Sequence, residues 1–283
     1  MKVEILKPYG FCMGVSNVIK LIEKIMKKHS GEKIYCVGQI VHNKDVNEHL
    51  SNKGITILSG DKSKLIDEID TGVVVFSAHG TDDKIIHKAK NKGLTVYDVV
   101  CPFVKKELDI VKESILKGCS IIYIGVRNHD ETNAVLSISD KIHFVSNVDD
   151  VKKLEIDNSQ IVVINQTTLS IYDLKDIYDE IKERYPSALF VDEICNSTRM
   201  RQQRIKSFHD GVDGIIVVGD NNSNNTLSLK KVASQAGYDV LLIENEHKLD
   251  MEWISTKKSI LIASGASTPN EVVNKVYEKI KNL

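Results

Sequence analysis

The segment Thr95-Val96-Tyr97-Asp98-Val99-Val100-Cys101-Pro102 contains the end of a predicted strand and the start of a predicted helix. Its β-branched and aromatic residues favour an extended chain. The proline favours the first turn of a helix, because the N–H that it lacks would have no partner there. Two other segments follow the same order: Val3–Leu6 runs towards Cys12, and Leu189–Ile194 runs into Cys195. The sequence therefore predicts three strand-to-helix transitions, each marked by a cysteine.

Short apolar runs alternate with amphipathic stretches along the whole chain. Ile171–Arg184 and Glu271–Lys281 have apolar residues at helical spacing. The runs between such stretches are short and rich in β-branched residues, as expected of strands buried in a parallel sheet. They are Val73–Phe76, Thr95–Val100, Ile121–Ile124, Ile161–Ile164, Ile215–Val218 and Ile260–Ala263. This alternation predicts the α/β fold class with mainly parallel sheets.

The three cysteines divide the chain into parts of similar length. Cys101 follows Cys12 by 89 residues, and Cys195 follows Cys101 by 94. A period of this length is too long for a solenoid unit, but it suits a small α/β lobe. We therefore expect three α/β lobes related by a pseudo-threefold axis. Their predicted bounds are 13–100, 101–194 and 195–283, and the N-terminal strand in 1–12 is expected to pack with the third lobe.

Two further series of polar residues repeat with the cysteines. One series follows them by 30, 28 and 30 residues, and the other by 67, 66 and 72. Each member lies at or just beyond the end of a predicted strand. In open α/β sheets, ligands bind beyond the carboxyl ends of the strands, where loops and helix N-termini meet. We expect these loops to face one central cavity. The first series is His42, His129 and Asn225, and the second is His79, Thr167 and Ser267.

The composition is that of an ordinary globular protein, and it narrows the classes of function. Of 283 residues, 42% are hydrophobic and 27% are charged, and the formal net charge is -1. There is no basic surplus to indicate nucleic-acid binding. The apolar runs are too short to span a membrane, and the N-terminus lacks the apolar stretch of a signal peptide. We expect a cytoplasmic protein with no nucleic-acid or membrane partner.

The five cysteines are odd in number and scattered, which argues against a disulfide framework. We interpret Cys36 and Cys119 as buried strand residues, because both lie in apolar runs. Three thiolates that converge from separate lobes can bind zinc or an iron–sulfur cluster. In a cluster, one iron would lack a protein ligand and could bind a substrate oxygen. The residues alone leave three interpretations open: a cluster, zinc, or small residues that end core strands.

The polar loop residues suit a phosphate group. Imidazoles of His42, His79 and His129 can donate hydrogen bonds or carry positive charge. The neutral donors in the predicted loops are Thr167, Thr168, Ser223, Asn225 and Ser267. Together with helix N-termini, such groups can hold a phosphate without a lysine-bearing loop. Neither a P-loop motif nor a convincing dinucleotide-binding glycine motif occurs, which argues against a nucleotide ligand.

Glu131 is the one acid that we select as a catalytic candidate. It lies two residues from His129 in a predicted extended loop, so the two side chains can face the same way and relay a proton. The alternative is an acid at a helix N-terminus, where the helix dipole favours it. The remaining histidines lie in charged or helical surroundings, and we interpret them as structural or exposed. They are His29, His49, His87, His143, His209 and His247.

Taken together, these motifs resemble those of the 4-hydroxy-3-methylbut-2-enyl diphosphate reductase family, also called the LytB family. The likeness covers nearly the full chain, in order. The motifs are Gly10-Phe11-Cys12-x-Gly14-Val15, Val41-His42-Asn43, Ser77-Ala78-His79-Gly80, Cys101-Pro102, His129-x-Glu131, Gln166-Thr167-Thr168-Leu169-Ser170, Cys195, Gly219-x-x-Asn222-Ser223-x-Asn225 and Gly265-Ala266-Ser267-x-Pro269.

The resemblance implies the last step of the non-mevalonate isoprenoid pathway. Enzymes of this family remove the hydroxyl of (E)-4-hydroxy-3-methylbut-2-enyl diphosphate by adding two electrons and two protons. The products are isopentenyl and dimethylallyl diphosphate. By this resemblance, Cys12, Cys101 and Cys195 hold a [4Fe-4S] cluster whose fourth iron binds the substrate hydroxyl. Electrons are implied to come from a separate ferredoxin or flavodoxin.

The resemblance also implies roles for the polar residues. Glu131 is implied as the main proton source, His129 as a residue that helps to pass protons, and Thr167 as a hydrogen-bond partner near the departing hydroxyl. The residues implied in substrate binding are His42, His79, His129, Thr168, Ser223, Asn224, Asn225 and Ser267. An alternative function is that of a non-catalytic iron–sulfur or zinc protein that senses or binds a phosphorylated metabolite.

Three positions depart from the usual pattern of the family. Asp130 replaces a common proline, and its charge would disfavour ionisation of Glu131 unless its side chain points elsewhere. Asn224 replaces a serine, but its amide can still donate a hydrogen bond. Asn270 replaces an aspartate after Pro269, where we expect a helix to start and either residue to cap it.

Overall fold

The computed structural model describes residues 1–207 and 211–283. The apolar runs of the sequence form its strands, because β-branched residues pack well on a pleated, buried surface. The strands are β1 (Lys2–Ile5), β2 (Ile34–Val37), β3 (Ile55–Leu58), β4 (Val73–Phe76), β5 (Thr95–Asp98), β6 (Ser120–Ile124), β7 (Ile142–Val145), β8 (Ile161–Asn165), β9 (Leu189–Val191), β10 (Gly214–Val218), β11 (Asp239–Ile243) and β12 (Ser259–Ser264).

Helices connect the strands, and most of them begin at a side chain that caps their first turn. The α-helices are α1 (Met13–Lys28), α2 (Lys44–Asn52), α3 (Lys62–Asp67), α4 (Asp83–Asn91), α5 (Pro102–Leu116), α6 (Asp130–Leu136), α7 (Val148–Lys152), α8 (Leu174–Arg184), α9 (Asn196–Ser207), α10 (Asn224–Gln235), α11 (Met251–Ser255) and α12 (Asn270–Lys281). A short 3₁₀ helix, η1, comprises Glu246–Lys248.

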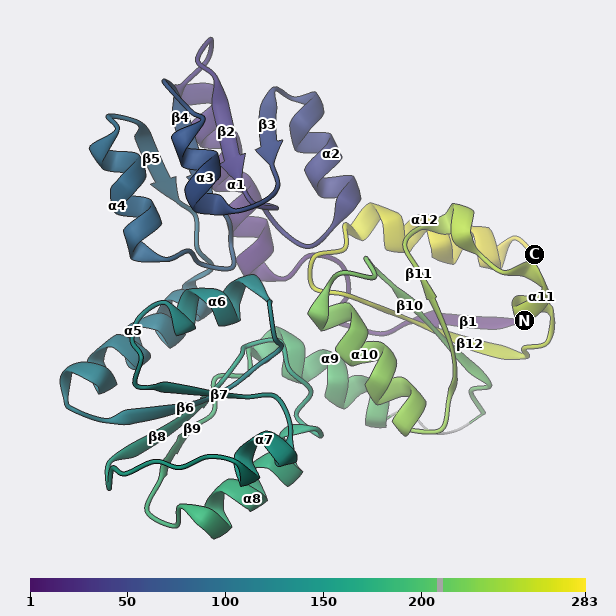
Figure 1. Cartoon of the computed structure of the whole chain (residues 1–283). Coiled ribbons are helices and arrows are strands. Elements are labelled where there is room, and N and C mark those ends of the chain that lie inside the picture. Colours follow the sequence, from purple (N-terminus) through teal and green to yellow (C-terminus); the bar gives the residue numbers. More distant parts are fainter. Residues whose placement is uncertain (208–210) are drawn as a thin grey trace.

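The strands form three parallel four-stranded sheets. Their orders are β3-β2-β4-β5, β7-β6-β8-β9 and β11-β10-β12-β1. The three orders are equivalent when β1 is treated as the last strand of its sheet. In each sheet this last strand lies at an edge, and β5, β9 and β1 lead to Cys101, Cys195 and Cys12. β1 pairs with β12, and α12 returns along β1, so the two chain ends lie close together (Figure 1). The predicted α/β class, with three lobes of parallel sheets, is confirmed.

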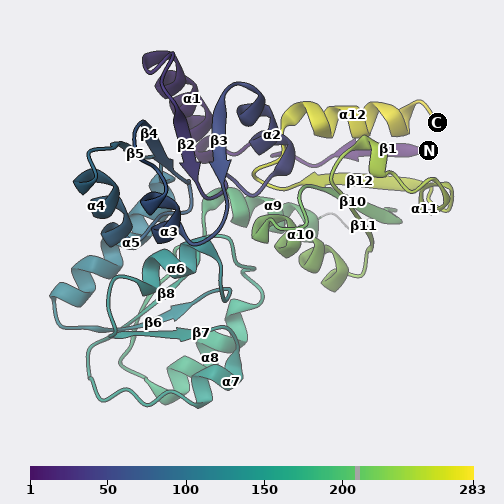
Figure 2. The same ribbon diagram turned by 45° about the horizontal axis from the view of Figure 1, so that its top comes forward.

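Each sheet has its own hydrophobic core on both faces. Around the sheet of β2–β5, one cluster contains Ile22 and Val75, and the other contains Ile66 and Phe76. The other two sheets are covered on both faces in the same way. Burial on both faces explains why the central strands read as continuous apolar runs rather than as alternating ones. The lobes are seen as three bodies that meet at one junction (Figure 2).

The helix after each cysteine packs against a different sheet from the strand before it. β1 belongs to the sheet of β10–β12, whereas α1 packs Val18 against the sheet of β2–β5. Likewise, α5 follows β5 but packs Val111 against the sheet of β6–β9. The helix α9 follows β9 but packs Ile205 against the sheet of β10–β12. The chain therefore passes from one lobe to the next at each of the three cysteines.

Polar contacts connect the lobes where they meet. They are an ion pair of 3.0 Å from Lys62 to Asp130, a hydrogen bond of 3.0 Å from Ser267 Oγ to the His42 carbonyl, and one of 2.9 Å from Asn224 Nδ2 to Thr168 Oγ1. Polar side chains of all three lobes therefore meet at the junction, beside apolar ones such as Val15 and Phe103. The predicted lobe bounds at 100/101 and 194/195 stay a prediction.

Three smaller expectations can be compared with the structure. Cys36 is buried in β2, as predicted. The prediction for Cys119 is wrong: it lies one residue before β6 and is only partly buried, because the strand begins at Ser120. His209 lies outside the described residues. Within residues 1–207 and 211–283, no helix has both the length and the apolar character needed to cross a membrane.

Arg201 of α9 connects the end of β12 to the loop that carries Cys12. Its guanidinium donates to the Ser264 carbonyl at 2.7 Å and to the Gly10 carbonyl at 2.7 Å. The side chain is 4% exposed, and burial lowers the pKa of Arg201 to about 10, still far above neutral pH. A planar guanidinium can bond two acceptors at once in a fixed geometry. Arg201 therefore fixes the position of the loop before Cys12.

We predict that Arg201→Met lowers the free energy of unfolding by about 3 kcal/mol, because it removes charged hydrogen bonds and leaves buried carbonyls without partners. Arg201→Lys should lose about half as much, since an ammonium cannot bond both carbonyls in the same plane. Urea unfolding of the metal-free protein measures this. The exposed Arg204→Met is the control and should change stability by less than about 0.5 kcal/mol. Equal stability of Arg201→Met and Arg204→Met would contradict the assignment.

Candidate active site

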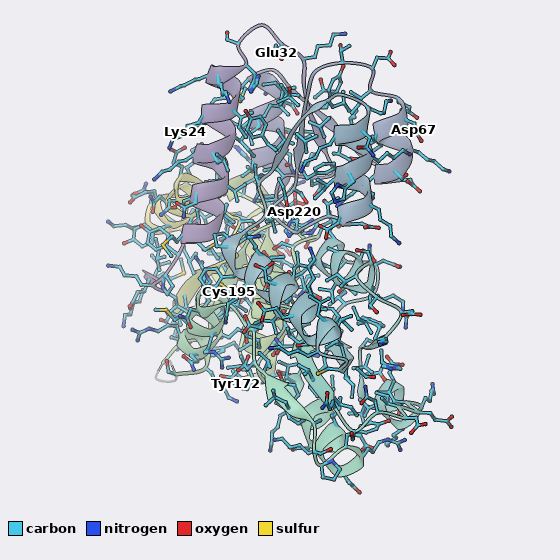
Figure 3. All side chains as sticks on the ribbon, turned by 90° about the vertical axis from the view of Figure 1, so that its left-hand side faces the viewer. Lys24, Glu32, Asp67, Tyr172, Cys195 and Asp220 are labelled. Carbon is cyan, nitrogen blue, oxygen red and sulfur yellow. The ribbon has the colours of Figure 1, made fainter. Side chains whose placement is uncertain are left out.

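One cavity at the junction of the lobes is lined by every residue that the sequence selects. The set is Cys12, His42, His79, Cys101, His129, Glu131, Thr167, Thr168, Cys195, Ser223, Asn224, Asn225 and Ser267. Residues from all three sheets therefore converge on one place, as the repeated spacing predicts. Cys195 lies toward the middle of the molecule, whereas Lys24, Glu32 and Asp67 lie at its outer edge (Figure 3).

The three cysteines have the same backbone environment. The N–H of Cys12 donates to the Ala266 carbonyl at 2.9 Å, and the N–H of Cys101 donates to the Ala78 carbonyl at 2.9 Å. The N–H of Cys195 donates to the Thr167 carbonyl at 3.0 Å. Each acceptor lies just after the strand beside the edge strand that leads to the cysteine. These bonds hold each cysteine at the cavity while the chain passes to the next lobe.

Each sulfur lies at the start of a helix. The Cys12 sulfur accepts a hydrogen bond from the N–H of Val15 at 3.3 Å. Burial raises the pKa of Cys101 to about 11 and also raises the pKa of Cys195, although backbone N–H groups at the starts of α5 and α9 oppose both shifts. Thiols with raised pKa values keep their protons in the metal-free protein at neutral pH. Helix N-termini would stabilise the thiolates once a cation replaces those protons.

The three sulfur atoms are spaced more widely than the ligands of one zinc ion. A tetrahedral zinc ion with Zn–S distances of about 2.3 Å holds its sulfurs about 3.8 Å apart. Among the described residues, the three sulfurs are not a group whose atoms all lie within 4.8 Å of one another. A Cβ atom on Gly14 would lie 2.7 Å from the Cys101 sulfur and 3.7 Å from the Cys12 sulfur. The missing side chain leaves a cradle between two thiols, which suits a polynuclear group better than zinc.

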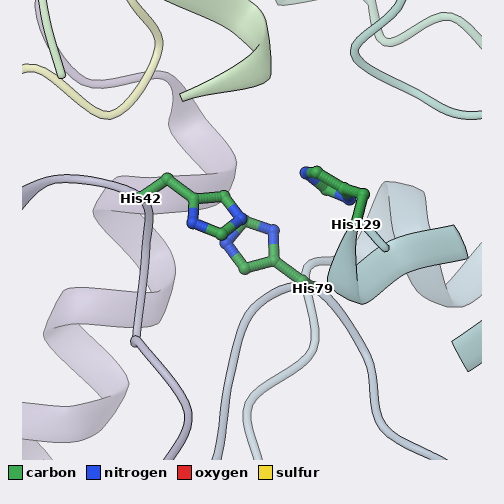
Figure 4. Close-up of side chains that lie close together, drawn as sticks. All are labelled: His42, His79 and His129. Atoms are coloured by element: carbon green, nitrogen blue, oxygen red, sulfur yellow. The ribbon is translucent and has the colours of Figure 1, made fainter. Parts of the chain in front are cut away.

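Three imidazoles from two lobes lie together on the cavity wall (Figure 4). The rings of His42 and His79 are stacked with centroids 4.1 Å apart, and His129 lies edge-on to both at 5.1 and 5.6 Å. One ring nitrogen from each lies within 4.8 Å of the others. The Nε2 atoms of His42 and His79 are buried without a hydrogen-bond partner among the described residues. The group can therefore surround an oxyanion or hold a metal ion.

The imidazoles are neutral in the free protein. Burial lowers the pKa of His42, lowers that of His79 well below its usual value, and lowers that of His129 to about 4. The N–H of Glu131 donates to His129 Nδ1 at 3.1 Å. Because Nδ1 accepts, the neutral His129 ring carries its proton on Nε2, as a donor. An incoming anion would raise all three pKa values by its charge.

Helix starts add donors beside the histidines. Ser223 caps α10, and Asn224 and Asn225 form its first turn. Asn225 Oδ1 accepts from the N–H of Ala266 at 2.9 Å. This bond joins the start of α10 to the loop that contains Ser267. No lysine or arginine occurs among the cavity-lining side chains of the described chain. Hydroxyl, amide and imidazole donors at a positive helix end favour an oxyanion over a cation at this wall.

Glu131 faces the cavity from the first turn of α6. It is 1% exposed, and its carboxylate accepts from the Thr167 N–H at 2.6 Å and from Thr167 Oγ1 at 3.1 Å. The predicted extended loop is wrong, since His129 caps α6 and Glu131 is its second residue. Burial raises the pKa of Glu131 despite the two bonds from Thr167. The site therefore contains a carboxyl group disposed to hold a proton.

The three residues that depart from the family pattern each make a different contact in the structure. Asp130 points to Lys62 and is not among the groups that shift the pKa of Glu131, because the helix start turns it away. The Asn224 amide donates to Thr168 across two lobes. Asn270 does not cap α12; it is the first residue of that helix, and its Oδ1 accepts from the Phe11 N–H at 3.2 Å.

Some residues of the site were not found from the sequence. Gln166, 0% exposed, accepts from the Val126 N–H at 2.8 Å and donates to Thr168 Oγ1 at 3.1 Å, so it joins the loops after β6 and β8. Its place beside Thr167 in the quoted motif was the available signal. No local sequence pattern indicates a role for Lys62, because its partner Asp130 lies far away in the sequence. None of the other described histidines lines the cavity.

Comparison with known proteins connects this geometry to one family. The model of the family described as LytB protein matches residues 3–281. The chain is 37% identical to 4-hydroxy-3-methylbut-2-enyl diphosphate reductase of Malacoplasma penetrans, over 98% of this chain and 96% of that protein. It is 35% identical to the protein of the same name from Bacillus mycoides, over 98% of this chain and 89% of that protein.

Solved structures show the same likeness. The reductase of Plasmodium falciparum, described as acting on E-1-hydroxy-2-methyl-but-2-enyl-4-diphosphate, has a TM-score of 0.92 at 30% identity, covering 98% of this chain and 87% of that chain. A second structure, described as the terminal enzyme of the non-mevalonate pathway, has a TM-score of 0.70 at 28% identity with full coverage of both chains.

The charges of Asp130 and Lys62 should shift the pKa values of His42 and His129 in opposite directions. Asp130 raises and Lys62 lowers the pKa of both His42 and His129, against the larger effect of burial. We predict that Asp130→Asn lowers both pKa values further and that Lys62→Met raises them. Nuclear magnetic resonance titration of the histidine ring protons in metal-free protein measures the shifts. The exposed Asp140→Asn is the control. Shifts of the same sign in the two variants would contradict the prediction.

Proposed function

The chain belongs to the LytB family, and we propose that it is a 4-hydroxy-3-methylbut-2-enyl diphosphate reductase that produces isopentenyl and dimethylallyl diphosphate by reductive dehydroxylation. One observation carries the proposal: thiols, imidazoles and a buried carboxyl from three lobes line a single cavity. Family membership supports an enzyme, and it does not favour the alternative of a non-catalytic sensor or a zinc protein.

We propose that Cys12, Cys101 and Cys195 hold a [4Fe-4S] cluster. The spacing of the sulfurs, their positions at helix starts and the cradle at Gly14 support this assignment. When bound, such a cluster supplies electrons and a Lewis-acidic iron without a protein ligand. The protein contributes three thiolates and the backbone N–H groups that stabilise them.

The diphosphate is proposed to lie against the histidine wall. The unpartnered Nε2 atoms of His42 and His79 and the Nε2 of His129 would turn toward it as donors. The remaining proposed contacts are those of Thr168, Ser223, Asn224, Asn225 and Ser267. Neutral imidazoles avoid mutual repulsion in the empty site, and the anion favours their protonation on binding. This arrangement explains how a trianionic group can be held without a lysine among the lining residues.

Glu131 is proposed to donate the proton that turns the departing hydroxyl into water. Burial raises the pKa of Glu131, which favours its protonated form, and its carboxyl group is fixed by the backbone and hydroxyl of Thr167. A positioned acid with a pKa near the working pH is an efficient proton donor. His129, joined to the N–H of Glu131, is proposed to assist the proton transfer next to the diphosphate.

A separate ferredoxin or flavodoxin is proposed as the electron donor, and the cytoplasm as the location. The lack of a dinucleotide-binding glycine motif supports an external donor, since the chain offers no recognisable site for a nicotinamide or flavin. Unpaired cysteines are consistent with a reducing compartment.

The function is tested with anaerobically purified protein, which should be brown and should consume the hydroxylated allylic diphosphate with a chemical reductant. Glu131→Gln should lower kcat by about 100-fold or more, because it removes a general acid. Its affinity for inorganic diphosphate should remain unchanged, since the histidine wall is intact. The exposed Glu155→Gln is the control. A colourless wild-type protein, or Glu131→Gln with full turnover, would contradict the proposal.

The cluster assignment is tested at Gly14. An alanine there would place its Cβ against two cysteine sulfurs, so we predict at least a twofold loss of bound iron per chain. The metal-free fold should tolerate the alanine, because the Cys101 side chain can rotate away when it holds no metal and alanine favours a helix over glycine by about 1 kcal/mol. Iron and sulfide analysis measures the loading, and circular dichroism checks the fold. Ser16→Ala, in the same helix, is the control. Full iron loading of Gly14→Ala would contradict the assignment.

A further inference from the structure

A second buried acid lies behind Glu131, outside the cavity lining. Glu107 is on α5 and is 0% exposed. Among the described residues, neither of its carboxylate oxygens has a hydrogen-bond partner. An ionised carboxylate that is buried without a partner is very unfavourable, so such a group keeps a proton or has a charged neighbour. The neighbours of Glu107 therefore decide its state.

Among the described residues, the groups with the largest effect on Glu107 are not cations. The ionisable groups that act on it are Glu131 from α6, Tyr123 from β6 and Glu193 from the segment after β9. Glu193 is already paired with Lys106, whose Nζ lies 2.8 Å from its carboxylate. The Tyr123 hydroxyl is also fully buried, makes no hydrogen bond of ordinary length among the described residues, and lies close enough to Glu107 to favour its ionised form as a donor. Two acids and a phenol in a dry pocket cannot all be ionised, and burial raises the pKa of Glu107 well above its usual value.

The carboxyl groups of Glu107 and Glu131 are close enough to share a hydrogen bond once one of them is protonated. As two carboxylates they would have no donor between them, which accounts for the unpartnered oxygens of Glu107. The other side of Glu131 is occupied by Thr167 and faces the cavity. Glu131 therefore lies between the cavity and a second carboxyl group that is sealed from solvent.

We infer that Glu107 is a positioning residue that acts through Glu131, as a buried proton reserve that restores the proton of Glu131 after it is used. The inference rests on the proposed function only for the step that consumes the proton. In that step two electrons from the proposed external donor enter the substrate, the C–O bond breaks, Glu131 gives its proton to the departing hydroxyl oxygen to form water, and a second proton adds to the allylic carbon. Glu107 then transfers its own proton to the Glu131 carboxylate. The Glu107 carboxylate left behind faces the Tyr123 hydroxyl, which acts as a donor, and a proton from the cavity returns to it through Glu131 before the next turnover.

A purely structural role for Glu107 makes a different prediction. Replacing a buried, poorly paired acid by an apolar residue of similar size is commonly neutral or stabilising. If Glu107 only filled space beside Val104 and Val111 on the buried face of α5, Glu107→Leu would keep full activity. The proton reserve predicts loss of turnover in a protein that folds at least as well as the wild type.

The first experiment needs no cluster and no substrate. Infrared spectroscopy of the metal-free protein detects the C=O band of a protonated carboxyl group. The wild type should keep this band above pH 7, and Glu107→Gln should remove part of it and shift what remains, because the two groups are bonded. The exposed Glu113→Gln, on the same helix, should leave the band unchanged. A band that is absent at pH 7, or unaltered by Glu107→Gln, would overturn the inference.

The second experiment separates turnover from the chemical step in the cluster-loaded protein. Glu107→Gln and Glu107→Leu should lower kcat at least tenfold with KM changed less than twofold, and the basic limb of the pH profile should move to lower pH. A single turnover should proceed within threefold of the wild-type rate, since the proton reserve acts only after the first proton of Glu131 has been used. Wild-type kcat and pH profile in both variants would overturn the inference. An infrared band that behaves as expected in a protein without reductase activity would instead contradict the proposed function alone.

Discussion

The structure depends on the bonds that hold three cysteines where the chain leaves one lobe for the next. Each cysteine N–H donates to a carbonyl beyond the neighbouring strand, and each following helix packs on another sheet. Three such crossings, arranged in the same way, force the starts of α1, α5 and α9 toward one point. A group bound by all three thiols would join the three lobes, so cofactor binding and lobe arrangement are coupled.

Charge is distributed in the cavity so that proton and anion sites lie side by side. One wall has neutral imidazoles and the N-termini of helices, which can bind an anion. The adjoining wall has Glu131, whose pKa is raised by burial, with Glu107 behind it. Burial favours the uncharged form of the groups on both walls in the free protein. The histidines become charged when the substrate binds, and Glu131 becomes charged when it gives up its proton. The cost of charging buried groups therefore falls on the reaction and not on folding.

Local patterns predicted the strands, the cysteine positions and the loop series, because a strand end followed by a helix start is encoded within a few residues. Non-local features were missed. The helical position of Glu131 depends on His129 acting as a cap, and the pairing of Asp130 with Lys62 joins two lobes. Glu107 did leave a signal: it occupies an apolar position of an amphipathic helix, between Val104 and Val111. A charged residue at such a position merits attention in any sequence.

The central claim is that thiols from three lobes hold one iron-containing group. Anomalous diffraction at the iron absorption edge, from crystals of anaerobically purified protein, tests it directly. The account predicts one compact iron peak at the junction of the lobes, in contact with the sulfurs of Cys12, Cys101 and Cys195. Iron at another place, or at a site reached by only one or two of these sulfurs, would contradict it.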